Sequence, residues 1–272
     1  MKRFIKILVL TALVSAACSC RTEPRLVILH TNDTHSHFEP IRSGADAGRG
    51  GVIERAAFVD SVRAAAGEDR VLLLHAGDFS QGTSYFSELG GRLEPKMINA
   101  LRYDCVTLGN HEFDNGIEDL TWRLAALENA SVVCANLDLS QFDISEYVKP
   151  YAIVERGGFK IGIIGLETNL SANVSSVVSS RIPQLDDVEV TNRWASYLKD
   201  TEKCDLVILL SHIGYEEDQK LVPQIRNVDL VVGGHSHTFT DEMIHVRDLD
   251  GRKVPIVTDG CFGVEMGEVR IY

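Results

Sequence analysis

The chain contains the stretch Leu26-Val27-Ile28-Leu29-His30-Thr31-Asn32-Asp33-Thr34-His35, in which an apolar run passes directly into a polar cluster. An apolar run of this length before a polar turn predicts a short strand that is buried on both faces, as in a parallel sheet covered by helices. Six more apolar runs of this kind follow, at residues 71–74, 105–108, 132–135, 161–166, 206–210 and 230–232. The core is therefore expected to be built from buried strands.

Segments with a helical spacing of apolar residues lie between several of these runs, at residues 52–65, 117–127 and 188–198. This alternation of strand and helix patterns predicts an α/β fold. Residues 151–155 and 159–164 flank Arg156-Gly157-Gly158 and predict an antiparallel hairpin, so the sheets are expected to be mixed. The serine-rich residues 171–180 are expected to form a loop, and residues 268–272 the last strand.

The 272 residues are 44% hydrophobic and 24% charged, which is typical of a packed globular protein. The length suits one large α/β unit, and we expect a single domain over residues 21–272. The formal net charge is −12, and it becomes −15 without the three basic residues of the first segment, Lys2, Arg3 and Lys6. Nucleic acid is therefore not an expected partner, because its phosphate backbone requires a basic surface.

The first 20 residues have a pattern of their own, in which three basic residues precede an apolar run at 7–17 that is too short to span a bilayer. This pattern predicts a signal peptide and hence an exported protein. The sequence Ser15-Ala16-Ala17-Cys18-Ser19-Cys20 resembles a bacterial lipobox, in which Cys18 and Cys20 compete as the lipidated residue. We therefore expect a periplasmic or outer-membrane-anchored bacterial lipoprotein that contacts membrane only through its lipid anchor. Plain secretion is the alternative.

Four further cysteines lie far apart and have neither CxxC nor metal-finger spacing. An exported protein can form disulfides, but a domain of this size does not need them for stability. We therefore expect buried thiols at Cys105, Cys134, Cys204 and Cys261.

Short polar clusters follow most of the predicted strands. Because the carboxyl ends of strands in an α/β sheet border a common crevice, these clusters are expected to come together there. Their Asp, His and Asn side chains are ligands for divalent cations, whereas a serine hydrolase would need an exposed serine on a sharp turn. A metal site is therefore predicted. The clusters are Leu29 to His35 of the opening stretch, Ala76-Gly77-Asp78, Gly109-Asn110-His111, Ser211-His212 and Gly233-Gly234-His235-Ser236-His237.

Taken together and in this order, the clusters resemble those of the calcineurin-like metallophosphatases. The resemblance rests on Asp33-Thr34-His35, Gly77-Asp78, Gly109-Asn110-His111-Glu112, His212 and Gly234-His235-Ser236-His237. The longer sequences from His30 to His35 and from Leu108 to Asp114 are similar to the 5'-nucleotidase branch of that family. The similarity extends from about residue 26 to residue 272.

The resemblance implies a four-layer α-β-β-α sandwich with mixed sheets that carries two divalent metal ions. One ion would be bound by Asp33, His35 and His237, the other by Asn110, His212 and His235, with Asp78 bridging the two. Two carboxylates would leave the two dications with about two positive charges in excess, which attract phosphate and lower the pKa of a bridging water. Mixed Asp, His and Asn ligation suits Mn, Zn and Fe.

The same resemblance assigns His111 and Asp114 to a catalytic dyad that stabilises the transition state or protonates the leaving oxygen. One helical turn would bring the Asp114 carboxylate to the His111 imidazole, raise its pKa and fix its tautomer. The alternative is that both are polar turn residues. His37 extends the first cluster, where it either borders the substrate entrance or is a solvated loop residue.

The sequence therefore predicts an exported two-metal phosphohydrolase, with a phosphomonoesterase of the 5'-nucleotidase type favoured, in which a metal-bound hydroxide attacks a small phosphate ester such as a nucleotide. Phosphodiesters, cyclic nucleotides, nucleotide sugars and sulfur esters are alternative substrates. A metal-stabilised binding subunit is an alternative of another class. We expect the second domain of typical 5'-nucleotidases to be missing after Tyr272, so either a separate chain supplies it or leaving groups are poorly distinguished.

Overall fold

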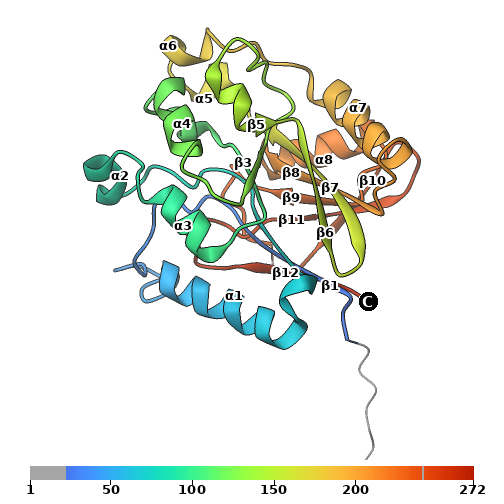
Figure 1. The fold of residues 1–272 in the computed structure, drawn as a ribbon, viewed down its shortest axis with the longest axis horizontal. Helices are drawn as coiled ribbons and strands as arrows, with labels where there is room; N and C mark the ends of the chain where they lie inside the picture. Colours follow the sequence, from blue (N-terminus) through green and yellow to red (C-terminus); the bar gives the residue numbers. More distant parts are fainter. Residues whose placement is uncertain (1–22, 241) are drawn as a thin grey trace, which may run out of the picture.

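The computed structural model describes residues 23–240 and 242–272 (Figure 1). The expected signal peptide, with Cys18 and Cys20, lies outside the described residues. Within the described ranges, no helix is long and apolar enough to cross a membrane. The four cysteines expected as thiols are all buried and unpaired in the structure.

The described strands form two mixed six-stranded sheets. The first has the order β12 (Gly267–Ile271), β1 (Leu26–Thr31), β2 (Val71–His75), β3 (Cys105–Thr107), β4 (Ser131–Val133) and β5 (Val148–Lys149). The second has the order β10 (Ile244–Arg247), β11 (Lys253–Val257), β9 (Leu230–Gly233), β8 (Leu206–His212), β7 (Phe159–Glu167) and β6 (Tyr151–Arg156). The pairs β1–β12, β6–β7 and β10–β11 are antiparallel, and the other neighbours run parallel.

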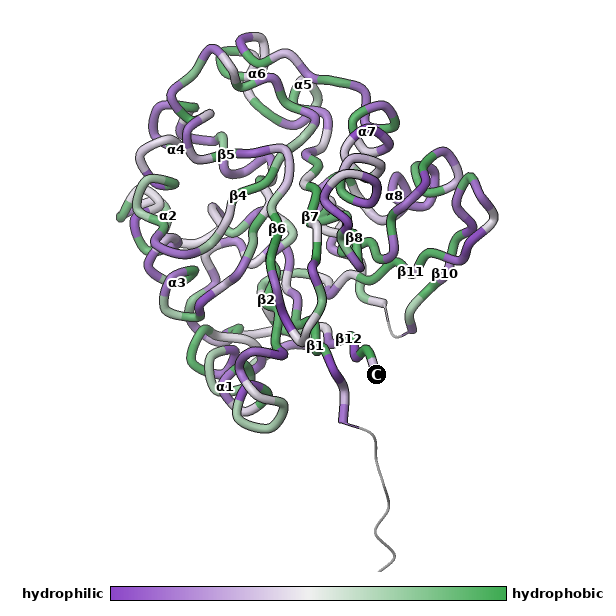
Figure 2. The backbone as a smooth tube through the Cα atoms, turned by 45° about the vertical axis from the view of Figure 1, so that its right-hand side comes forward, coloured by the Kyte–Doolittle hydropathy of each residue, from purple (hydrophilic) through white to green (hydrophobic). Residues whose placement is uncertain are grey.

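The two sheets stack face to face because successive residues of a strand point to opposite sides. Leu26 and Ile28 of β1 pack against the second sheet, in one cluster with Ile163 of β7. The alternate face of β1 packs under α1 (Val52–Ala66), α3 (Glu94–Leu101) and α4 (Ile117–Leu124). On the far side, α7 (Asp187–Asp200) and α8 (Tyr215–Leu221) cover the second sheet. The predicted four-layer α-β-β-α sandwich is confirmed, with its most apolar segments along the central strands (Figure 2).

The hairpin between β6 and β7 is also confirmed, since Arg156 pairs with Phe159 around the two glycines. The loop expected at 171–180 is wrong, because this segment contains most of α5 (Leu170–Asn173) and all of α6 (Ser176–Ser179). Asn169 and Ser175 accept hydrogen bonds at the starts of these helices. Asparagine and serine are common both at helix N-caps and in loops, so the composition of this segment did not distinguish short helices from a loop.

The remaining described helices are short. They are α2 (Ser84–Leu89) and the 3-10 turns η1 (Glu68–Arg70), η2 (Asn110–Phe113), η3 (Asp143–Glu146) and η4 (Val222–Gln224).

Candidate metal centre

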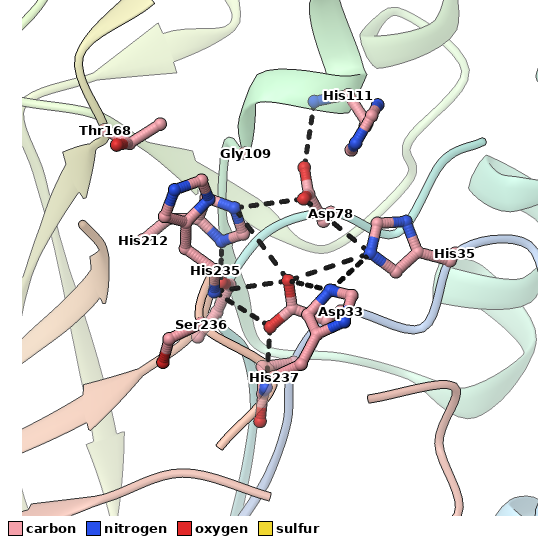
Figure 3. Close-up of polar contacts among 12 residues, drawn as sticks. Asp33, His35, Asp78, Gly109, His111, Thr168, His212, His235, Ser236 and His237 are labelled. Carbon is pink, nitrogen blue, oxygen red and sulfur yellow. Dashed lines mark hydrogen bonds and ion pairs between the residues drawn. The ribbon is translucent and has the colours of Figure 1, made fainter. Parts of the chain in front are cut away.

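The polar clusters that follow the strands meet at the carboxyl ends of the parallel strands (Figure 3). The first sheet contributes the segments after β1, β2 and β3, and the second contributes the end of β8 and the segment after β9. Side chains from both sheets therefore point into one site. The residues are Asp33 and His35 after β1, Asp78 after β2, His212 in β8, and His235 and His237 after β9, while the expected ligand Asn110 directly follows the β3 segment at the start of η2.

Among the residues that the structure describes, three sets of side chains bring their donor atoms to within 4.8 Å of one another. Two of these sets follow the ligand division expected from the family resemblance, except that the second contains Asp78 and not Asn110, and the third adds His111. His35 belongs to two sets, as does Asp78. The sets are Asp33 with His35 and His237, Asp78 with His212 and His235, and His35 with Asp78 and His111.

The distances show how tightly the donors converge on two carboxylates. His212 Nε2 lies 3.1 Å from Asp78 Oδ2, and His237 Nε2 lies 3.5 Å from Asp33 Oδ1. His35 Nε2 lies 3.8 Å from an oxygen of each carboxylate. It is also 2.9 Å from Nε2 of His237. Imidazole nitrogens and carboxylates that face a common point are the donors that Zn, Mn and Fe bind in proteins.

Most of the candidate ligands have a left-handed backbone conformation. A positive φ is uncommon for residues other than glycine, and such strain clusters at functional sites. Gly77 precedes Asp78, and a Cβ atom there would lie 2.5 Å from Nδ1 of His212, so only glycine lets the two strand ends approach. The candidate ligands with positive φ are Asp33 (48°), His35 (45°), Asp78 (53°), His235 (73°) and His237 (52°).

The orientation of the ligands is set by hydrogen bonds outside the cluster. His212 Nδ1 donates to the carbonyl of Ala76 at 2.7 Å, so the other ring nitrogen is left as the acceptor. This Nε2 is buried and faces Oδ2 of Asp78 without a well-aligned hydrogen bond, and Oδ1 of Asn110 is buried without a hydrogen-bond partner. Burial lowers the pKa of His35 and His235, which favours the neutral imidazole that binds metal, whereas Asp78 raises the pKa of His212 and the hydrogen bond with Asp33 raises that of His237 to about 10. Buried donors without partners next to two carboxylates fit a divalent-metal site.

His111 and Asp114 form the expected pair. Nδ1 of His111 lies 2.8 Å from Oδ2 of Asp114, and this hydrogen bond raises the pKa of His111. Both belong to one turn, since η2 includes His111 and ends just before Asp114. The backbone N–H of His111 donates to Oδ1 of Asp78 at 2.9 Å. The dyad therefore borders the candidate ligands directly.

Two buried charged residues support the site and were not expected from the sequence. Glu112 accepts hydrogen bonds from the backbone N–H groups of Asp78 and Ser80, at 2.8 and 3.0 Å. Arg123 of α4 is fully buried and donates to the Ser80 hydroxyl and the Glu112 carbonyl. The position of Glu112 directly after the Asn110-His111 pair was a usable signal. The sequence held no such signal for Arg123, because Ser80 and Glu112 come close to it only when the chain folds.

His37 is half-buried against another aromatic ring. Its ring packs against that of Phe262 with 4.2 Å between centroids, and Nδ1 donates to the carbonyl of His35 at 2.9 Å. Phe262 was not singled out from the sequence, because it lies between β11 and β12, far along the chain from the first cluster.

Comparison with known proteins agrees with this geometry. The family model described as calcineurin-like phosphoesterase matches residues 26–239. The chain belongs to this family. Its sequence is 37% identical to the snake venom 5'-nucleotidase of Gloydius brevicauda, over 90% of this chain and 45% of that protein. Most of this calcineurin-like phosphoesterase therefore resembles part of a 5'-nucleotidase.

Two solved structures have the same fold. The 5'-nucleotidase precursor of Thermus thermophilus superposes with a TM-score of 0.81 at 34% identity, over 90% of this chain and 51% of that one. The NAD nucleotidase of Haemophilus influenzae gives a TM-score of 0.80 at 30% identity, over 89% and 52%. The chain spans about half the length of these relatives.

Proposed function

We propose that the protein is an exported, metal-dependent phosphohydrolase of the 5'-nucleotidase type that acts on phosphomonoesters. The observation that carries this proposal is the convergence of four imidazoles on the carboxylates of Asp33 and Asp78, beside the His111–Asp114 dyad. Relatives named as nucleotidases support a nucleotide as one substrate. Export rests on the pattern of the first 20 residues.

We expect the donor set to hold two divalent ions. Asp33, His35 and His237 would hold one, Asn110, His212 and His235 the other, and Asp78 would touch both. When bound, two such ions would supply Lewis-acid stabilisation of phosphoryl oxygens and would lower the pKa of the attacking water, so that hydroxide is available near neutral pH.

The chain itself fixes the positions of these donors. The backbone N–H of His235 donates to both carboxylate oxygens of Asp33, at 2.9 and 3.2 Å, and the side chain of Asn32 donates to the same group at 2.7 Å. Because hydrogen bonds to a carboxylate are strong and directional, these donors orient Asp33 before any ion binds. The site is thus prepared to bind cations and, through them, phosphate.

The dyad would act on the phosphate ester directly. Because Nδ1 of His111 is engaged by Asp114, the opposite ring nitrogen is the one left to donate a hydrogen bond to a phosphoryl or leaving oxygen. This role requires only that the ring keep its orientation, which Asp114 provides.

A metal-reconstitution assay tests the proposal. Protein stripped with chelator is reloaded separately with Mn, Zn or Fe and assayed with p-nitrophenyl phosphate, a nucleoside 5'-monophosphate and bis(p-nitrophenyl) phosphate. We expect activity to return with at least one metal and to favour the monoesters. Preference for the diester would make the protein a phosphodiesterase. Tight metal binding without hydrolysis of any ester would favour a binding subunit instead.

A further inference from the structure

An aromatic pair lies directly beside the candidate metal centre. The rings of His37 and Phe262 lie 4.2 Å apart with 35° between their planes. The ring of Phe262 is also 5.8 Å from the ring of His35 and 5.8 Å from that of His237. Both rings of the pair are partly exposed. A phosphate bound at an ion held by His35 and His237 would therefore have an aromatic surface next to it.

The pair is held in place from both loops that carry it. The backbone N–H of Phe262 donates to the carbonyl of Asp33 at 2.7 Å, and Phe262 itself has a φ of 61°. Arg55 is buried beneath the pair and donates to the carbonyl of His37 at 3.1 Å. Its guanidinium also fills the space in which a side chain at Gly263 would lie. These contacts fix the positions of both rings beside the candidate metal centre.

Room for a substituent exists on the His37 side. A cavity of about 280 Å³ begins at His37 and is lined by Phe38 and Tyr85, whose rings meet edge to face at 5.2 Å. Tyr85 donates to Glu39 at the rim of this cavity. The volume is close to the lower end for ligand pockets, about 300 Å³, and suits one ring of a small molecule.

We propose that His37 and Phe262 form the wall of a leaving-group subsite that selects phosphate esters with a planar aromatic leaving group. The proposal rests on the proposed function, since it requires the phosphate to lie at the metal centre. A flat ring can stack on Phe262 or enter the adjoining cavity, whereas a saturated ring of the same size has no π face to offer. The site would therefore distinguish leaving groups by planarity, in contrast to the poor discrimination expected from the sequence.

The test uses two phosphonates that cannot be hydrolysed and differ only in the ring. Benzylphosphonate and cyclohexylmethylphosphonate are titrated into the metal-loaded protein by calorimetry, with metal content and melting temperature measured for every variant. We expect benzylphosphonate to bind about fivefold more tightly than cyclohexylmethylphosphonate. Because a tenfold change in the dissociation constant corresponds to about 1.4 kcal/mol, this is a difference of about 1 kcal/mol in binding free energy. Phe262→Leu and His37→Leu, which keep an apolar side chain, should bring this ratio towards one. The control is Tyr147→Ala, which removes an exposed aromatic ring in another part of the fold and should keep the ratio.

The possible outcomes separate the two proposals. Equal affinity for both phosphonates, or a ratio that survives both leucine variants with metal content intact, would overturn the subsite and leave the phosphohydrolase standing. If the metal-loaded protein binds neither phosphonate and also hydrolyses no phosphomonoester, the proposed function is overturned, and the subsite with it.

Discussion

The carboxylate of Glu112 lies behind Asp78 and accepts a hydrogen bond from its backbone N–H at 2.8 Å. The same carboxylate accepts from the N–H of Gly109, at 2.7 Å, directly before the candidate ligand Asn110. One buried side chain thus links the segment after β2 to the segment after β3. Because the bonds are made to backbone groups, they fix the spacing between Asp78 and Asn110 independently of any bound ion.

Glu112→Gln tests this link. An amide can accept through its oxygen, but its NH2 group would face a backbone N–H that also needs an acceptor. We therefore expect the free energy of unfolding of the metal-free protein to fall by about 1–3 kcal/mol. Metal affinity should fall by about 10- to 100-fold, as measured by competition with a chelator. Glu118→Gln, an exposed position on α4, is the matched control. Unchanged metal affinity in Glu112→Gln would show that the link does not position the ligands.

Asp78→Asn tests the bridging role. Asparagine keeps the shape of the side chain but removes the charge that two dications would share. We expect metal content and hydrolysis to be lost together, as determined by elemental analysis and turnover of the same preparation. Asp60→Asn, an exposed carboxylate paired with Arg102, should change neither. Two tightly bound ions with near-normal turnover in Asp78→Asn would contradict the assignment.

The sequence predicted the central strands well because they are buried on both faces. β7 and β8 are apolar runs rich in isoleucine, valine and leucine, which is typical of a strand that is covered on both faces. β5 and β10 were not predicted, and neither was β11, in which Pro255 interrupts a short apolar pattern. β5 has only two residues, and β10 is a half-exposed edge strand, so neither of these two has an apolar pattern that is distinguishable from a loop.

The candidate ligands were predictable for a related reason, since each follows or ends a recognisable strand. Asp78 and His212 could therefore be placed at one end of the strands before any side-chain geometry was known. The positions of the supporting residues Arg123 and Phe262 could not be predicted in this way. Arg123 reaches Ser80 across 43 residues of chain, and Phe262 reaches His37 from a loop of the opposite end of the sequence. Contacts between distant segments leave no local pattern.

Labelling with a fatty acid in a bacterial host tests the expected anchor. If a cysteine near the start of the chain is lipidated, the wild type should incorporate label and partition into membranes. Whichever of Cys18→Ser and Cys20→Ser abolishes incorporation identifies the modified residue. Secretion of unlabelled protein in all three cases would favour plain export, and retention in the cytoplasm would contradict the signal peptide.

His111→Ala separates catalysis from metal binding. His111 lies beside the candidate ligands but is not expected to hold an ion, so the variant should keep its metals and lose about 10²- to 10⁴-fold in kcat. Asp114→Asn should lose less, because the imidazole remains and only the group that orients it is weakened. Elemental analysis alongside kcat decides whether the loss is catalytic.

The dependence on the leaving group distinguishes the two roles open to His111. If His111 donates a proton to the leaving oxygen, His111→Ala should be impaired far more with an alkyl phosphate such as glycerol phosphate than with p-nitrophenyl phosphate, whose leaving group needs little protonation. If it instead stabilises charge on the phosphoryl oxygens, both substrates should lose a similar factor. An unchanged kcat with glycerol phosphate would assign neither role, and the hydrogen bond to Asp114 would then serve only to shape the turn after β3.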